Sequence, residues 1–89
     1  MLNEKVNITN QLGLHTRAAA KLVALAARFQ SQIQITRPDT GQKADCKSIM
    51  AIMLMGAGKG TLLQLQIMGD DELDARDAIV SLINNHFGE

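Results

Sequence analysis

Three stretches of this chain alternate between hydrophobic and polar residues, and this two-residue period predicts strands with one buried face. They are Lys5–Thr9, Gln32–Thr36 and Thr61–Met68. A turn over Arg37–Gly41, which contains Pro, Asp and Gly, leads into a short polar strand, Gln42–Asp45, that completes a hairpin. The residues expected to point inward are Val6, Ile8, Ile33, Ile35, Leu63, Leu65 and Ile67. The opposite face, with Gln34, Gln64 and Gln66, is expected to meet water.

Three other segments have the residue pattern of helices. The stretch from Ala18 to Ala27 contains no Gly or Pro and is rich in Ala and Leu, so it predicts a helix that follows a turn over Asn10–Gly13. Ser48 can cap a short helix that continues to Leu54. The acidic segment Gly69-Asp70-Asp71-Glu72 is expected to open a last helix, because its carboxylates suit both the capping of a helix N-terminus and the helix dipole. The residues of the first and last helices expected to face the core are Ala19, Leu22, Val23, Ala26 and Phe29, and Leu73, Ala75, Ala78, Ile79, Leu82 and Ile83.

The resulting element order, βαββαβα, predicts an α+β fold of two layers, in which helices cover the apolar face of one sheet. A chain of 89 residues is expected to form a single domain, residues 1–89, with one core. Phe29 and Phe87 are the only aromatic residues, so aliphatic side chains and methionine must make up most of that core.

Composition narrows the classes of function. Nine basic and nine acidic residues cancel, which argues against a nucleic-acid partner. Cys46 is the only cysteine, so no intrachain disulfide can form, and we expect a buried thiol in a reducing compartment, the cytoplasm. Cys46 and the two histidines lack metal-ligand spacing, so no metal or cofactor is expected. The start of the chain has no apolar leader and no apolar run reaches membrane-spanning length, so we expect no insertion into a membrane.

His15 is the residue that most directly suggests chemistry, because it directly precedes the first predicted helix. Free backbone N–H groups and the helix dipole favour anions at that position. Arg17 adds a planar guanidinium that suits phosphate. An imidazole beside these groups suggests a histidine that accepts a phosphoryl group. A solvated helix end with no chemistry is the alternative that spacing alone leaves open.

Two segments together resemble one known family. The run GLHTRAAAKLV, which contains His15, is similar to the active-site segment of the HPr family, the histidine-containing phosphocarriers of the bacterial phosphotransferase system. The run KSIMAIMLMGAGKGT, from Lys47 to Thr61, resembles the second signature of that family, around a regulatory serine. The resemblance implies an open-faced sandwich whose antiparallel four-stranded sheet has the strand order 1-4-2-3, with all three helices on one face.

The resemblance also implies a mechanism. Enzyme I, supplied by phosphoenolpyruvate, would phosphorylate Nδ1 of His15, and the group would pass to enzyme IIA-type domains. Arg17 and the backbone N–H groups of Thr16 and Arg17 would hold the phosphate. The protein would then be a carrier with a covalent intermediate rather than an enzyme, and it would act as a monomer with an exposed docking face.

Ser48 has two possible roles. An N-cap is the simple one, and the resemblance adds phosphorylation by an HPr kinase/phosphorylase. The helix that follows has too many apolar residues to bury, although Ile52 and Met55 suit the core, and exposed methionines adapt to several partners. The docking residues implied by the resemblance are Ala20, Ala24, Ala27, Ile49, Met50 and Met53. Some family members have lysine at positions 24 and 27, so electrostatic docking would be weaker here.

Three other functions compete with this interpretation. A nitrogen-branch phosphocarrier of the NPr type would share the histidine site. A binding module that uses the methionine-rich surface without phosphoryl transfer would not need His15. A hydrolase with His15 as base lacks a paired acid or nucleophile. Gly56–Thr61 lacks the spacing of a nucleotide-binding loop and is expected to be a turn, and His86 is expected to lie on the surface of a helix.

Ala18 occupies a position where the family most often has proline. Proline suits a first helical turn because it needs no N–H partner and restricts the unfolded chain. We predict that Ala18→Pro raises the free energy of unfolding by about 0.5–1 kcal/mol, provided that the φ angle is compatible. Urea denaturation of the two proteins measures the difference, and a clear loss of stability would contradict the prediction.

Overall fold

The computed structural model describes the whole chain, Met1–Glu89. The elements are β1 (Leu2–Asn7), α1 (Thr16–Ala26), β2 (Gln32–Arg37), β3 (Gln42–Asp45), α2 (Ile49–Leu54), β4 (Leu62–Met68), α3 (Glu72–Asn84) and a final 3-10 turn, η1 (His86–Gly88). This confirms the predicted order βαββαβα. No helix is both long enough and apolar enough to cross a bilayer.

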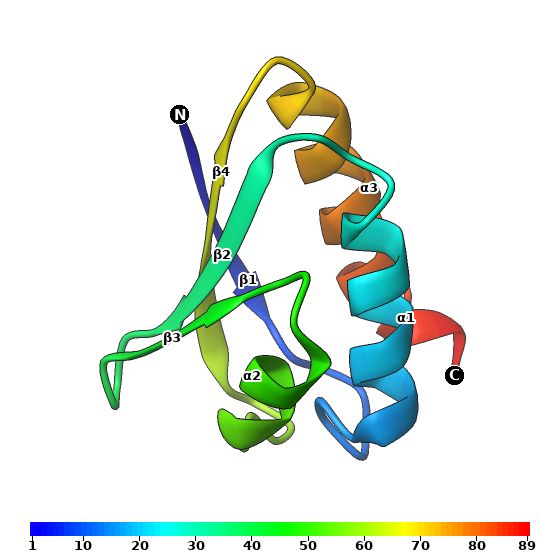
Figure 1. Ribbon diagram of the computed structural model, residues 1–89. Coiled ribbons are helices and arrows are strands. Elements are labelled where there is room, and N and C mark those ends of the chain that lie inside the picture. The colour runs from blue at the N-terminus through cyan, green and yellow to red at the C-terminus, as the bar shows by residue number, and fades with distance from the viewer.

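The four strands form one antiparallel sheet in the order β1-β4-β2-β3, as the resemblance implied. In the register of the two central strands, Ile33 lies opposite Ile67 and Ile35 opposite Leu65. The three helices lie on the same side of this sheet (Figure 1). The fold is therefore the predicted two-layer α+β sandwich with one open sheet face.

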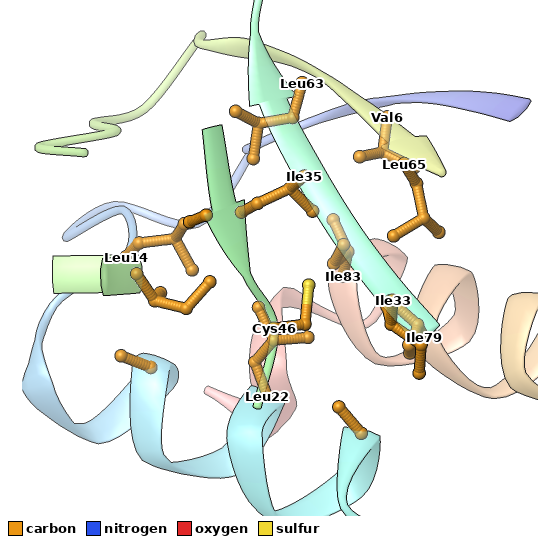
Figure 2. Close-up of a cluster of buried hydrophobic side chains, with 14 of the residues drawn as sticks. Val6, Leu14, Leu22, Ile33, Ile35, Cys46, Leu63, Leu65, Ile79 and Ile83 are labelled. Atoms are coloured by element: carbon orange, nitrogen blue, oxygen red, sulfur yellow. The ribbon is translucent and has the colours of Figure 1, made fainter. Parts of the chain in front are cut away.

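The core lies between the sheet and the helices and contains 21 buried residues. Figure 2 shows side chains from both layers pointing into it, with the Cys46 thiol among them. The inward-facing residues predicted for the strands are all buried, whereas Val23 and Phe29 of the first-helix stripe are only partly so. Ile8 lies beyond the end of β1 but is fully buried, and its N–H donates to the Thr61 carbonyl at 2.9 Å.

Two predictions for α3 are wrong. Leu73 is 57% exposed, because it lies two residues, and so about 200°, away from Ala75 on the helix surface. The buried line consists of Ala75, Ile79 and Ile83. The Asp71 side chain does not cap α3 but accepts hydrogen bonds from the backbone of the α1–β2 connection and from Ser31 Oγ, which lower the pKa of Asp71. The acidic segment thus connects the start of α3 to the loop between α1 and β2.

The end of the chain also differs from the prediction. His86 is exposed, as expected, but it lies in η1 rather than in the last long helix. His86 and Phe87 are the only residues other than glycine with positive φ, at 55° and 56°. Phe87 is completely buried and is the largest such side chain. The chain therefore turns sharply after α3 and is anchored in the core by Phe87.

Two substitutions on α3 test which face is buried. Ile79→Ala should lower the free energy of unfolding by about 2–5 kcal/mol, because it removes a fully buried side chain and leaves a cavity. Leu73→Ala should change it by less than about 0.5 kcal/mol, because that side chain is exposed. Urea unfolding of both variants measures the two values, and similar losses would contradict the assigned face.

Candidate functional site

The first turn of α1 presents unpaired backbone donors. His15 is the N-cap residue, with extended backbone angles (φ −73°, ψ 176°), and its side chain does not cap the helix. The amides of Thr16, Arg17 and Ala18 have no acceptor within the protein, as expected for the first residues of a helix. Three N–H groups and the positive end of the helix dipole therefore lie in the three residues that directly follow His15, which makes this position suitable for an anion.

The loop before His15 is held against the segment that follows α2. The Leu14 N–H donates to the Ala57 carbonyl at 2.8 Å, and the Leu14 side chain is buried. Gly13 has a φ of 65°, and a Cβ there would lie 2.5 Å from the Ala57 oxygen and 2.7 Å from Gly58 Cα. The Asn10 side-chain amide donates to the Gly13 carbonyl at 2.7 Å. These contacts set the residue at which α1 begins and leave His15 at the surface.

A carboxylate that the sequence analysis did not select joins the site. His15 Nε2 lies 2.9 Å from Glu89 Oε1, and Arg17 Nε donates to Glu89 Oε2. The Lys21 ammonium lies 3.9 Å from the same Oε2 and donates to the Phe87 carbonyl at 2.7 Å. The His15 and Glu89 side chains are each only about one-fifth exposed, at 21% and 20%, whereas Arg17 is 65% exposed. One carboxylate thus bridges the imidazole and the guanidinium.

The electrostatics of Glu89 follow from these contacts. The hydrogen bond from Arg17 is the main cause that lowers the pKa of Glu89 from 4.5 to about 2, and the hydrogen bond with His15 has a smaller effect in the same direction. The same pairing raises the pKa of Arg17. Because the folded-state pKa is depressed, the contact stabilises the folded tail above the ordinary carboxyl pKa and is lost as pH falls toward 2. Glu89 is therefore an ionised, acceptor-only group at neutral pH.

A second group of predicted residues lies on the neighbouring surface of α1 and α2, which contact each other. Ser48 is the N-cap of α2, and its Oγ accepts from the Ala51 N–H at 3.3 Å, which confirms the capping role. Ile52 and Met55 are buried as predicted. The residues assigned to docking are all exposed, namely Ala20, Ala24, Ala27, Ile49, Met50 and Met53. Leu54 and Leu12 are exposed as well, at 72% and 64%.

Two further predictions concern residues outside the site. Cys46 is a free, fully buried thiol, and burial raises its pKa to about 12. A thiol with so high a pKa is a poor nucleophile, and it fills core volume as predicted. The glycine-rich segment 56–61 leads into β4 and not into a helix, so it lacks the architecture of a nucleotide-binding loop.

Comparisons with known proteins agree with this geometry. The family model described as "PTS HPr component phosphorylation site" matches residues 2–85. The chain is 47% identical to the phosphocarrier protein HPr of Cupriavidus necator over 89 residues, all of this chain and 98% of that protein. It is 51% identical to the HPr of Pseudomonas putida over 86 residues, covering 96% of this chain and 93% of that protein.

Solved structures give the same result. A crystal structure of HPr from Thermoanaerobacter tengcongensis superposes with a TM-score of 0.94 at 42% identity, covering 100% of this chain and 98% of that one. The structure of HPr from Bacillus anthracis superposes with a TM-score of 0.86 at 30% identity, covering 92% and 95%. The fold and the site thus define a small phosphoryl carrier of the bacterial phosphotransferase system. The chain belongs to the HPr family, and the nitrogen-branch and non-catalytic alternatives are not favoured.

The close contact at Gly13 gives a test of how the site is held. Gly13→Ala should lower the free energy of unfolding by about 2 kcal/mol or more, because it combines a strained φ with a clash against backbone atoms. Gly41→Ala is the matched control, because its φ is 78° but no atom lies within 4 Å of the added Cβ, so the loss should be about 1 kcal/mol. Equal losses in urea unfolding would show that the Ala57 contact is unimportant.

Proposed function

We propose that His15 is the residue that carries the phosphoryl group. The observation that supports this most strongly is the position of His15 as the N-cap of α1, directly before three unpaired amides, with its ring linked through Glu89 to the Arg17 guanidinium. Neutral imidazole is a competent nucleophile near neutral pH. In the proposed step, the lone pair of Nδ1 forms the bond to phosphorus. The bond from phosphorus to the donor breaks, and its electron pair leaves with the donor.

The groups around His15 would then stabilise the product. The N–H groups of Thr16 and Arg17 would donate to the phosphoryl oxygens, and the Arg17 side chain would supply a charge-assisted contact. These groups are exposed, and water screens their interaction with the phosphate. Moderate stabilisation suits a carrier, because the group must leave again. We therefore infer that the protein acts through a covalent intermediate and not as an enzyme that turns over a substrate of its own.

Enzyme I, supplied by phosphoenolpyruvate, is the proposed donor, and enzyme IIA-type domains are the proposed acceptors. The exposed apolar side chains of α2 border the site, which is the arrangement expected for a surface that different partners contact in turn. Ile49, Met50 and Met53 would form the apolar part, with Ala20, Ala24 and Ala27 along α1. A monomer would leave this face accessible. We place the carrier in the cytoplasm, which the lone reduced Cys46 supports.

Ser48 is a candidate for regulation within the same surface. Its side chain caps α2 and lies next to the exposed Ile49. A phosphate there would add negative charge to the docking surface. Phosphorylation by an HPr kinase/phosphorylase would therefore weaken docking. It would not disrupt α2, because a helix N-terminus tolerates an anion.

The experiment that tests the acceptor is phosphorylation with phosphoenolpyruvate and a bacterial enzyme I, followed by intact-mass analysis. The wild-type protein should gain one acid-labile phosphoryl group. His15→Ala should gain none, while the control His86→Ala, which changes the other histidine, should be labelled like the wild type. Labelling of a folded His15→Ala protein would contradict the proposal.

A further inference from the structure

The short helix that carries the exposed apolar side chains has few anchors of its own. α2 contains six residues, a length at which an isolated helix is not stable in water. Ile52 is its only buried residue, and the C-cap residue Met55 is buried as well. Met50, Met53 and Leu54 are exposed. The position of α2, and with it the position of these exposed side chains, therefore depends on contacts from outside the helix.

The last carbonyl groups of α2 receive such contacts from the hairpin formed by β2 and β3. A helix leaves the carbonyls of its last turn without donors of its own. Nη1 of Arg37 donates to the Met55 carbonyl at 2.8 Å and to the Gly56 carbonyl at 3.2 Å. Nε2 of Gln42 donates to the Leu54 carbonyl at 3.4 Å. Three successive carbonyls thus bind two side chains of one hairpin, whose strand β3 contacts α2 (Figure 1).

The Arg37 guanidinium is itself held in place. Its Nε donates to Asp39 Oδ1 at 2.8 Å, and its side chain is only 22% exposed. The backbone is fixed by the hairpin turn, in which the N–H groups of Thr40 and Gly41 both donate to the Arg37 carbonyl. Because a guanidinium carries several donors in one plane, it can bind the Asp39 carboxylate and the end of α2 at the same time. Its positive charge also suits the negative end of the helix dipole.

We propose that Arg37 is a positioning residue for partner docking, which fixes the C-terminal end of α2 and so presents Met50 and Met53 in one arrangement before a partner arrives. This inference rests on the docking surface proposed above. A surface that is already ordered binds more tightly, because association then costs less conformational freedom. Arg37 does not need to touch the partner, and it takes no part in phosphoryl transfer at His15. Its effect is therefore on affinity and not on the transfer step.

Three variants separate this role from others. Arg37→Met removes the donors but keeps much of the aliphatic length of the side chain. Arg76→Met is the matched control, because Arg76 lies on α3, is 32% exposed and pairs with Asp77 instead of the end of α2. Met53→Gln tests the docking surface itself, because it places a polar amide on the exposed side of α2. Urea unfolding checks that all three proteins are folded.

The first readout is hydrogen exchange of the Met55 and Gly56 amides, which close the last turn of α2 by donating to the Ile52 and Met53 carbonyls. Their protection should fall about tenfold in Arg37→Met, because the end of α2 then opens more often, and should not change in Arg76→Met. The amide of the fully buried Leu65 in β4 reports global unfolding and serves as the internal reference.

The second readout is the affinity for enzyme I, measured by calorimetry in the absence of phosphoenolpyruvate. The Kd should rise about tenfold in Arg37→Met, because the partner must then order α2 as it binds, and should not change in Arg76→Met. The rate of phosphorylation at saturating concentrations of the carrier should be the same for Arg37→Met and the wild type.

Unchanged protection of Met55 and Gly56 in Arg37→Met would overturn the proposal even if the Kd rose, since Arg37 would then act by touching the partner. An unchanged Kd, or a slower rate at saturation, would overturn it as well. If Met53→Gln binds enzyme I like the wild type, the docking surface is wrong and the inference falls with it. Weaker binding by Met53→Gln beside unchanged binding by Arg37→Met contradicts the inference alone. The binding measurement needs no phosphoryl group, so its result is independent of the role of His15.

Discussion

The arrangement of groups around His15 depends on the residue at which α1 begins. A helix cannot satisfy the N–H groups of its first turn internally, so the residue that starts the helix decides where those donors are exposed. Here the start is fixed by contacts outside the helix, the hydrogen bond from Leu14 to Ala57 and the close approach of Gly13 to the same segment. With Leu14 buried and Thr16 already helical, His15 must lie at the surface next to the free donors.

The segment from Lys47 to Thr61 therefore helps to hold the loop before His15 in place. Gly13 and Leu14 pack on residues 57–58, a few residues after the end of α2, so the helix with the exposed apolar side chains is held near the start of α1 and His15. Ile52 and Met55 anchor α2 in the core, while Met50 and Met53 face away from it. One short helix thus has a buried face and an exposed apolar face, and in the proposed function this arrangement would bring a docking protein close to His15.

The parts of the molecule that depend on local sequence were predictable. The alternation of Leu63, Leu65 and Ile67 with glutamines located the strand and its buried face, and the Ala-rich stretch located the helix that follows His15. The predicted burial of Leu73 was wrong, because an apolar residue in the first turn of a helix can lie on either side of a narrow buried stripe. The capping role predicted for the acidic segment was wrong for Asp71, because its carboxylate accepts hydrogen bonds from Gln30 and Ser31 in another loop.

Glu89 could not be predicted, because its role depends on a tertiary contact across 74 positions and on a backbone conformation that non-glycine residues rarely adopt. The one available signal in the sequence was Phe87, one of only two phenylalanines, since burial of so large an apolar side chain would draw the end of the chain towards the core. The measurement that tests the central claim most directly is nitrogen and phosphorus NMR of the phosphorylated protein. The account predicts a bond between phosphorus and Nδ1 of His15. A phosphoryl group on Nε2 of His15, or on another residue, would contradict it.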